Sequence, residues 1–134
     1  MSESRFHIPQ TPPPRSIAPV IVRLKRLYGQ WMRLHASLPK SQRYSLGIKI
    51  DSLLVDALEA GSAAAFARRE EKAPCLRVAV RKIDTVGVLL SLLWEHNLVD
   101  ATKYAGLASE LAEIGKMFGG WLGQTMKTPS TLSE

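Results

Sequence analysis

Four stretches of the chain repeat apolar residues every three or four positions, and this repeat is the feature that most restricts the fold. Such spacing keeps the apolar side chains on one stripe of an α-helix. The first stretch carries Ile17, Val20, Leu24, Leu27, Trp31, Leu34 and Leu38, and Pro39 ends it because proline cannot continue a helix. The second starts near Ser41 and carries Leu46, Ile50, Leu53, Ala57, Ala60 and Ala64. Gly61 weakens its last turns, so its end is expected between Ala60 and Arg68.

The other two patterns lie in the second half of the chain. The third is expected to begin at Pro74, a favoured first-turn residue, and carries Leu76, Ala79, Ile83, Val86, Leu90 and Leu93. The fourth follows Asp100, a good N-cap, and carries Tyr104, Leu107, Leu111, Ile114, Phe118 and Trp121. Short connections after the first and third helices make neighbours antiparallel. The sequence therefore predicts an all-α, up-down-up-down four-helix bundle over residues 16–125.

Both ends of the chain are expected to be flexible. Residues 1–15 contain Pro9, Pro12, Pro13 and Pro14, which favour extended conformations and exclude a helix. After Gln124 the apolar repeat stops and Pro129 follows, so residues 126–134 are expected to fray.

Positive charge is concentrated in the first half of the chain. The formal net charge is +6, yet no acidic residue occurs between Glu3 and Asp51. Nine cations fall in that stretch: Arg5, Arg15, Arg23, Lys25, Arg26, Arg33, Lys40, Arg43 and Lys49. An uncompensated run of this kind attracts polyanions such as RNA or DNA, and acidic membrane surfaces are the competing partner.

Helical positions select the candidate nucleic-acid contacts. Arg23, Arg26 and Arg33 share one side of the first helix, beside its apolar stripe. Arg77 and Arg81 lie opposite the stripe of the third helix, and Lys82 lies obliquely. The connection before that helix adds Arg68, Arg69 and Lys72, partly offset by Glu70 and Glu71. Arginine forks onto phosphate oxygens, which favours backbone contacts with little sequence preference and a steep salt dependence. An ordinary solvated face is the alternative for any single residue.

Catalytic, metal and cofactor chemistry find no support in the sequence. The Glu-x-x-His pairs of a di-metal bundle are absent. His35 and His96 lie near helix ends that should run parallel, but two histidines without a located third ligand make a poor metal site, and both are interpreted as helix-end residues. Cys75 is the only cysteine and is interpreted as a small apolar residue. We expect a non-enzymatic, cofactor-free, cytoplasmic protein without a membrane span or small-molecule substrate.

Glycines interrupt the fourth helix in a regular pattern. Gly115, Gly119 and Gly123 are spaced by four, and Gly120 adjoins them. Each glycine costs about 1 kcal/mol relative to alanine inside a helix, so close approach of another backbone is expected to offset the loss. That backbone belongs either to another subunit or to a neighbouring helix of the same chain. The helix is electrically neutral, because Lys103 and Lys116 balance Glu110 and Glu113.

Two segments resemble a known group of four-helix-bundle proteins. The segment from Leu38 to Gly47, LPKSQRYSLG, with Ile50 after it, resembles the turn into the second helix of these proteins. The group has two branches: the accessory variability determinant proteins of diversity-generating retroelements, and the proteins encoded in ribosomal-RNA intervening sequences. The segment from Glu113 to Leu122, EIGKMFGGWL, is similar to the fourth helix of the accessory variability branch. Residues 55–61, VDALEAG, depart from the Ala-Asn-Ile-Ala-Glu-Gly-like stretch of the other branch.

The resemblance, over roughly residues 17–124, implies a basic, barrel-shaped homopentamer. It implies binding to a reverse transcriptase and to RNA or DNA with little sequence preference, in support of mutagenic copying. Carried over by position, Lys40, Arg43, Arg77, Arg81 and Lys82 become nucleic-acid contacts, and Gly119, Gly120 and Trp121 serve packing. The alternative is an oligomeric scaffold that binds another protein, in which the charge provides only solubility.

Overall fold

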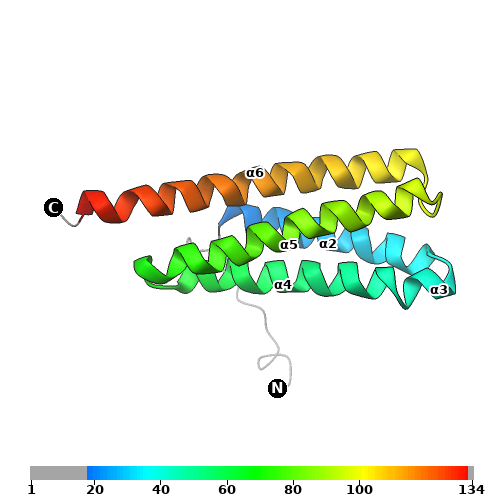
Figure 1. Cartoon of the computed structure of the whole chain (residues 1–134), viewed down its shortest axis with the longest axis horizontal. Coiled ribbons are helices and arrows are strands. Elements are labelled where there is room, and N and C mark those ends of the chain that lie inside the picture. The colour runs from blue at the N-terminus through cyan, green and yellow to red at the C-terminus, as the bar shows by residue number, and fades with distance from the viewer. Residues whose placement is uncertain (1–17, 133–134) are drawn as a thin grey trace, which may run out of the picture.

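Four long helices lie side by side in the computed structural model, which describes residues 18–132 and the side chains of residues 18–127 (Figure 1). They are α2 (Pro19–Ser37), α4 (Leu46–Phe66), α5 (Arg69–Glu95) and α6 (Ala101–Leu132). A short helix, α3 (Lys40–Arg43), lies in the turn between α2 and α4. No strand occurs within residues 18–132, and the predicted all-α helical bundle is confirmed. The proline-rich arm, residues 1–15, lies outside the described part.

The core follows the four predicted stripes. Trp31 of α2 and Phe118 of α6 are its largest fully buried side chains, and Ile50 of α4 and Leu76 of α5 are also fully buried. Each long helix packs against two neighbours: α2 and α5 both contact α4 and α6. The helices α2 and α5 therefore occupy opposite corners of the bundle. This arrangement decides which cations can share a surface.

The third helix begins earlier than the sequence predicts. Its first residue is Arg69, so Pro74 lies inside α5 and the prediction of a start at Pro74 is wrong. Two interactions stabilise the extra turn at the start of α5. Glu70 and Glu71 lie in the first turn, where the helix dipole favours negative charge. The Nζ of Lys72 donates a hydrogen bond of 2.6 Å to the last-turn carbonyl of Ala64 in α4.

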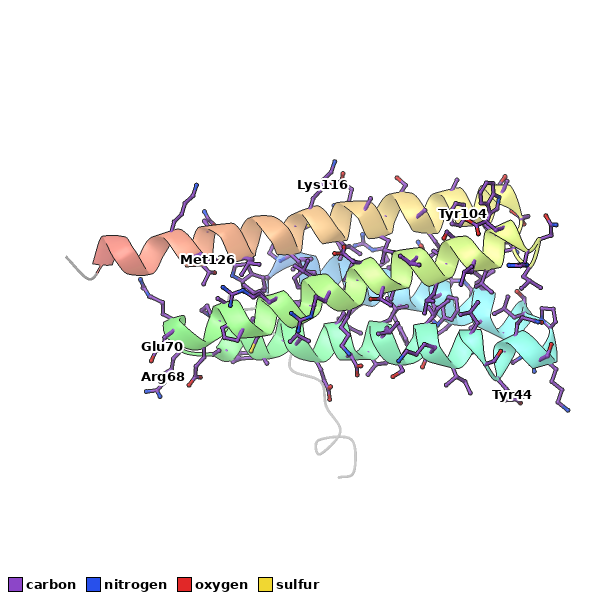
Figure 2. The ribbon with its side chains drawn as sticks, viewed as in Figure 1. Tyr44, Arg68, Glu70, Tyr104, Lys116 and Met126 are labelled. Carbon is purple, nitrogen blue, oxygen red and sulfur yellow. The ribbon has the colours of Figure 1, made fainter. Side chains whose placement is uncertain are left out.

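This early start changes the surroundings of the basic residues expected in the connection. Only Ala67 and Arg68 separate α4 from α5, so Arg69 and Lys72 are helical. The guanidinium of Arg68 lies 3.9 Å and 3.8 Å from the carboxylates of Glu70 and Glu71. Figure 2 shows Arg68 and Glu70 together at one end of the bundle, with Tyr44 and Tyr104 near the other.

The second helix is divided at its start. The sequence predicts a helix from near Ser41, but α3 ends at Arg43 and α4 begins at Leu46, because Ser45 leaves helical geometry with φ −123° and ψ −92°. Gly47 then lies against His35 of α2. A Cβ at Gly47 would come within 2.6 Å of the His35 ring, so glycine lets α4 approach α2 at this point.

One of the two later helix ends agrees with the sequence, and the other needs correction. The helix α4 ends at Phe66, within the expected range from Ala60 to Arg68. Gly61 is buried, and a Cβ there would lie 2.6 Å from Ile21 and 3.0 Å from Phe118. The helix α6, in contrast, continues past its expected end at Gln124, as far as Leu132. Thr125 is buried against the bundle, which places the first residue after the expected end in a packed position.

Candidate nucleic-acid interface

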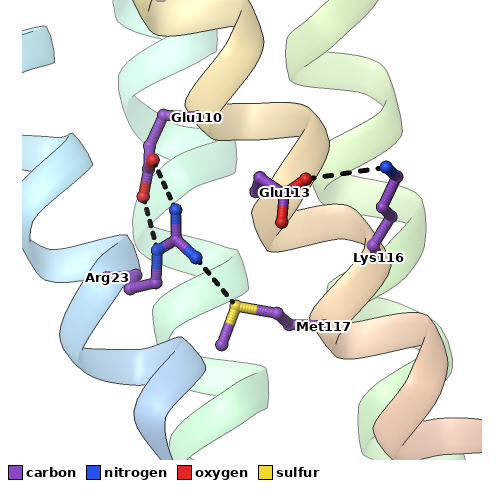
Figure 3. Close-up of polar contacts among 5 residues, drawn as sticks. All are labelled: Arg23, Glu110, Glu113, Lys116 and Met117. Atoms are coloured by element: carbon purple, nitrogen blue, oxygen red, sulfur yellow. Dashed lines mark hydrogen bonds and ion pairs between the residues drawn. The ribbon is translucent and has the colours of Figure 1, made fainter.

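Arg23, the first candidate contact on α2, is committed to an ion pair within the chain. Its Nε donates to Oε2 of Glu110 at 2.8 Å, and its Nη2 donates to Oε1 at 2.7 Å (Figure 3). Its Nη1 also donates to the sulfur of Met117 at 3.6 Å. The whole guanidinium is therefore oriented toward α6. Although its helical position is the predicted one, Arg23 fastens α2 to α6 instead of facing a ligand.

The ion pair keeps Glu110 ionised. Hydrogen bonds from Arg23 lower the pKa of the Glu110 carboxyl below its ordinary value of 4.5, and the positive charges of Arg23 and Arg26 contribute in the same direction. The Arg23 guanidinium has a raised pKa, first because of its hydrogen bond to Glu110. Both charges are neutralised by each other at neutral pH, so the pair adds little net field to the surface.

Arg26 and Arg33 lie together in a groove between α2 and α6. The groove has a volume of about 490 Å³, and Lys103, from the first turn of α6, lines it with them. Both arginines and Lys103 are exposed. Within residues 18–127, no acidic side chain forms an ion pair with any of the three. Three cations thus face solvent across one groove.

Lys103 is the member of this group that sequence reasoning misses. The sequence balances Lys103 and Lys116 against Glu110 and Glu113 over a helix that is expected to end at Gln124. Because α6 continues to Leu132, it also includes Lys127 and is not neutral. In space, Glu110 pairs with Arg23, and Glu113 lies 3.5 Å from Lys116 (Figure 3). Lys103 forms no ion pair with an acidic side chain of the described residues, and it lines the groove between α2 and α6. The antiparallel topology could have indicated this position of Lys103, because it brings the start of α6 beside the end of α2.

The turn after α2 holds two further candidates in different environments. Lys40 is exposed at the start of α3. Arg43 is half-buried: its Nη2 donates to the carbonyl of Leu38 at 3.1 Å, and its guanidinium lies 5.8 Å from the centre of the Tyr44 ring. Arg43 therefore braces the turn, while Lys40 is accessible to a polyanion.

The candidates on α5 form a separate group. Arg77 and Arg81 are exposed, in agreement with their predicted position opposite the apolar stripe. The Nη2 of Arg77 lies 3.6 Å from the sulfur of Met126. Lys82 is less available, because its Nζ lies 3.3 Å from the carboxylate of Asp56 in α4. Since α2 and α5 are diagonal, Arg77 and Arg81 do not share a surface with the α2/α6 groove.

The two histidines serve helix ends. The Nε2 of His35 is hydrogen-bonded to the carbonyl of Arg43 at 2.9 Å, and its ring stacks on Trp31 with centres 5.1 Å apart. His96 is the C-cap of α5 and is exposed. Cys75 is partly buried against the core. Among the described residues, no three His, Cys, Asp or Glu side chains gather closely enough to hold a metal ion.

Comparison of the chain with known protein families, curated proteins and solved structures gives no match. No helix in residues 18–132 has the length and apolar character needed to cross a bilayer.

The glycines of α6 do not contact a neighbouring helix closely. A Cβ at Gly119, Gly120 or Gly123 would meet no atom within 4 Å, and one at Gly115 would lie 3.7 Å from Ile83, an ordinary contact. Trp121 is half-buried and stacks with Phe118, with centres 6.5 Å apart. It lines a second groove, of about 790 Å³, with Gly120 and Gly123. Tight packing against residues 18–127 is thus not the reason for these glycines.

Proposed function

We propose that this protein is a non-catalytic nucleic-acid-binding protein that contacts the phosphate backbone of RNA or DNA. The observation that carries the proposal is the cluster of Arg26, Arg33 and Lys103, three exposed cations that form no ion pair with an acidic side chain of residues 18–127. Arginine can donate two parallel hydrogen bonds to a phosphate, and lysine supplies a point charge. Contacts of this kind position a nucleic acid without reading its bases.

Further support comes from what surrounds the cluster. Lys40 at the end of the bundle, and Arg77 and Arg81 on α5, are exposed cations that a long polyanion can reach. The described surface has no row of neighbouring exposed aromatic rings on which successive bases could stack. Tyr44 lies in the turn before α4, Phe66 is the last residue of α4, and Trp94 lies near the end of α5, where it stacks on the half-buried Tyr104. We therefore expect binding with weak sequence preference.

Fluorescence anisotropy tests the proposal. A labelled structured RNA is titrated with the full chain at two salt concentrations, and affinity is expected to fall steeply as salt rises because bound counterions are released. Each lost phosphate contact lowers the logarithmic salt slope by about 0.7 to 0.9. Affinity that is absent at low salt, or that does not change with salt, contradicts the proposal.

The partner proposed for this activity is a reverse transcriptase of a diversity-generating retroelement, with the protein acting in the cytoplasm as an accessory to copying. The support is the resemblance of residues 38–50 and 113–122 to the accessory variability proteins. Co-purification of the two proteins from cells that express both is the direct test. A reverse-transcriptase gene with two near-identical repeats beside the gene for this chain would add support, and failure to co-purify would contradict the partnership.

An oligomeric scaffold is the second candidate function, and the glycine face of α6 favours it. Gly119, Gly120 and Gly123 lower helix stability, yet nothing in the described chain packs on them. A second copy of the chain, in a homopentamer of the kind that the resemblance implies, accounts for them by close helix approach. Light scattering of Gly119→Leu tests this assembly. A smaller mass than that of the unmodified protein supports it, and an unchanged mass contradicts it.

A further inference from the structure

The contact between α2 and α6 is open at two places and closed between them. One groove lies beside Arg26 and Arg33, and the other lies beside Val20 and Trp121. The Arg23–Glu110 pair, with Met117, joins the helices between these grooves (Figure 3). This contact holds α2 and α6 together beside the first groove, which Glu110 also lines.

The walls of the first groove carry polar groups that suit an anion. Arg26 and Arg33 are seven residues apart, which places them on the same face of α2 and about 10 Å apart along the helix axis. Gln30 lies between them, and Thr102 and Lys103 face them from the first turn of α6. Cations and neutral hydrogen-bond donors thus approach one space from two helices.

The floor of the groove is apolar. It is formed by Leu27 and Leu34 from α2 and by Leu107 from α6, all buried. Gly106 completes the α6 wall, and a Cβ at that position would meet nothing within 4 Å. The absence of a side chain at Gly106 therefore contributes to the open volume. A groove of about 490 Å³ falls within the size range of small-ligand sites.

The electrostatic balance of the groove is positive. Its only carboxylate is Glu110, and both oxygens of Glu110 accept hydrogen bonds from Arg23. Glu110 also attracts Arg26, but none of the three cations Arg26, Arg33 and Lys103 forms an ion pair with an acidic side chain of residues 18–127. The groove therefore has an excess of positive charge, which attracts an anion.

We infer that the α2/α6 groove is a phosphate-binding site that takes a nucleotide, with the phosphate on Arg33, Arg26 and Lys103 and the nucleoside against the leucine floor. The nucleotide comes either from a nucleic-acid chain or from free solution. The first source rests on the proposed function, and the second does not. Both sources present the same phosphate chemistry to the groove.

Isothermal titration calorimetry of the full chain with a nucleoside 5′-monophosphate and with inorganic pyrophosphate tests the site. Arg33→Ala is expected to weaken binding of both probes by about ten- to hundredfold, the effect of losing one hydrogen bond to a charged group. Arg69→Ala is the matched control: it removes one exposed arginine at the other end of the bundle and is expected to leave affinity unchanged.

A second variant tests the groove without changing any charge. Gly106→Leu places a side chain in the open volume, while Ala105→Leu adds the same side chain at an adjacent exposed position outside the groove. Circular dichroism establishes that both variants are folded. Loss of nucleotide binding in Gly106→Leu alone supports the site, and equal binding by the two variants overturns it.

Labelled RNA distinguishes the two sources of the nucleotide. If Gly106→Leu weakens both RNA and nucleotide binding, the groove holds a nucleotide of the nucleic-acid chain. If the free nucleotide binds in the groove but RNA binds nowhere, the site stands and the proposed function fails. If RNA binds in a salt-dependent way while neither probe binds the unmodified protein, the site is overturned and the proposed function stands.

Discussion

Glu110 of α6 receives two hydrogen bonds from the guanidinium of Arg23 on α2, at 2.7 Å and 2.8 Å, across 87 positions of sequence. The pair neutralises the charge of one arginine on the basic side of α2 and the charge of the carboxylate that lines the groove beside it. Its partner residues come from the first and last helices of the bundle, so the pair also closes the ring of helix contacts.

Glu110→Gln is expected to make the protein less stable at neutral pH and to flatten its response to acid. The folded protein lowers the pKa of Glu110, because Arg23 binds the ionised form. The stabilisation is therefore complete above the ordinary pKa of 4.5 and is lost as pH falls through the lower, folded-state value. Urea unfolding between pH 7 and pH 3 measures this difference.

The control for that experiment is Glu113→Gln. Glu113 is exposed and lies 3.5 Å from Lys116, three residues along the same helix. Exposed pairs of this type contribute at most about 1 kcal/mol, so this variant should follow the unmodified protein closely. If the free energy of unfolding depends on pH in the same way for Glu110→Gln and the unmodified protein, the ion pair does not contribute to folding stability.

Glu110→Gln should also raise affinity for polyanions. The substitution removes a negative charge beside the groove and releases the Arg23 guanidinium, which lies one turn before Arg26 on α2. RNA binding by anisotropy is expected to become tighter and its salt dependence steeper. Glu113→Gln changes net charge by the same amount without freeing an arginine, so an equal gain in both variants would argue against the release of Arg23.

Asp51 is the first acidic residue after the long basic stretch, and it joins α2 to α4. Its Oδ1 accepts a hydrogen bond from the Tyr28 hydroxyl at 2.8 Å and one from Trp31 Nε1 at 3.2 Å. Asp51→Ala is expected to cost about 2–3 kcal/mol in the free energy of unfolding, since Trp31 is almost completely buried and loses its partner. Tyr28→Phe, which removes one bond, should cost less; equal losses would contradict the assignment of two bonds.

The same bond predicts behaviour at high pH. The hydrogen bond to Asp51 raises the pKa of Tyr28 above its ordinary value of 10.0, with burial and the charge of Asp51 adding to the effect. The contribution to stability is present below pH 10 and is lost as pH rises through the folded-state value. Spectrophotometric titration of the unmodified protein should show one tyrosine that ionises above the ordinary pKa of 10.0, and this tyrosine should be missing from the titration of Tyr28→Phe.

The apolar stripes were sufficient to predict the bundle and nearly all of its core, because period and burial are set by residues three or four apart. Contacts between distant segments were not predictable in this way. The partner of Arg23 lies on another helix, and the chain gives no local sign of it. The same holds for Lys103, whose role depends on the spatial order of the helices. The sequence pattern also predicts too late a start for α5, because the hydrogen bond from Lys72 to the end of α4 that stabilises this start joins two different helices.

The glycines also show that contacts between distant segments cannot be predicted from local sequence. Alanine substitutions at two of them are expected to change stability in opposite directions. The sequence pattern singles out Gly115, Gly119, Gly120 and Gly123 of α6, yet Gly47 and Gly61 of α4 are the glycines that neighbouring side chains approach closely. Gly47→Ala is expected to destabilise the protein by about 1–3 kcal/mol, because its Cβ would come within 2.6 Å of the His35 ring.

Gly119→Ala should have the opposite effect within a single chain. Among the described residues, no atom of another part of the chain lies within 4 Å of the added Cβ, and alanine is about 1 kcal/mol more favourable than glycine inside a helix. Urea unfolding of both variants, at a concentration where light scattering gives the mass of one chain, compares them directly. If Gly119→Ala is less stable only at concentrations where the protein is assembled, the glycine face is an interface between copies. If Gly119→Ala is less stable than the unmodified protein as a single chain, the result contradicts the open space around Gly119.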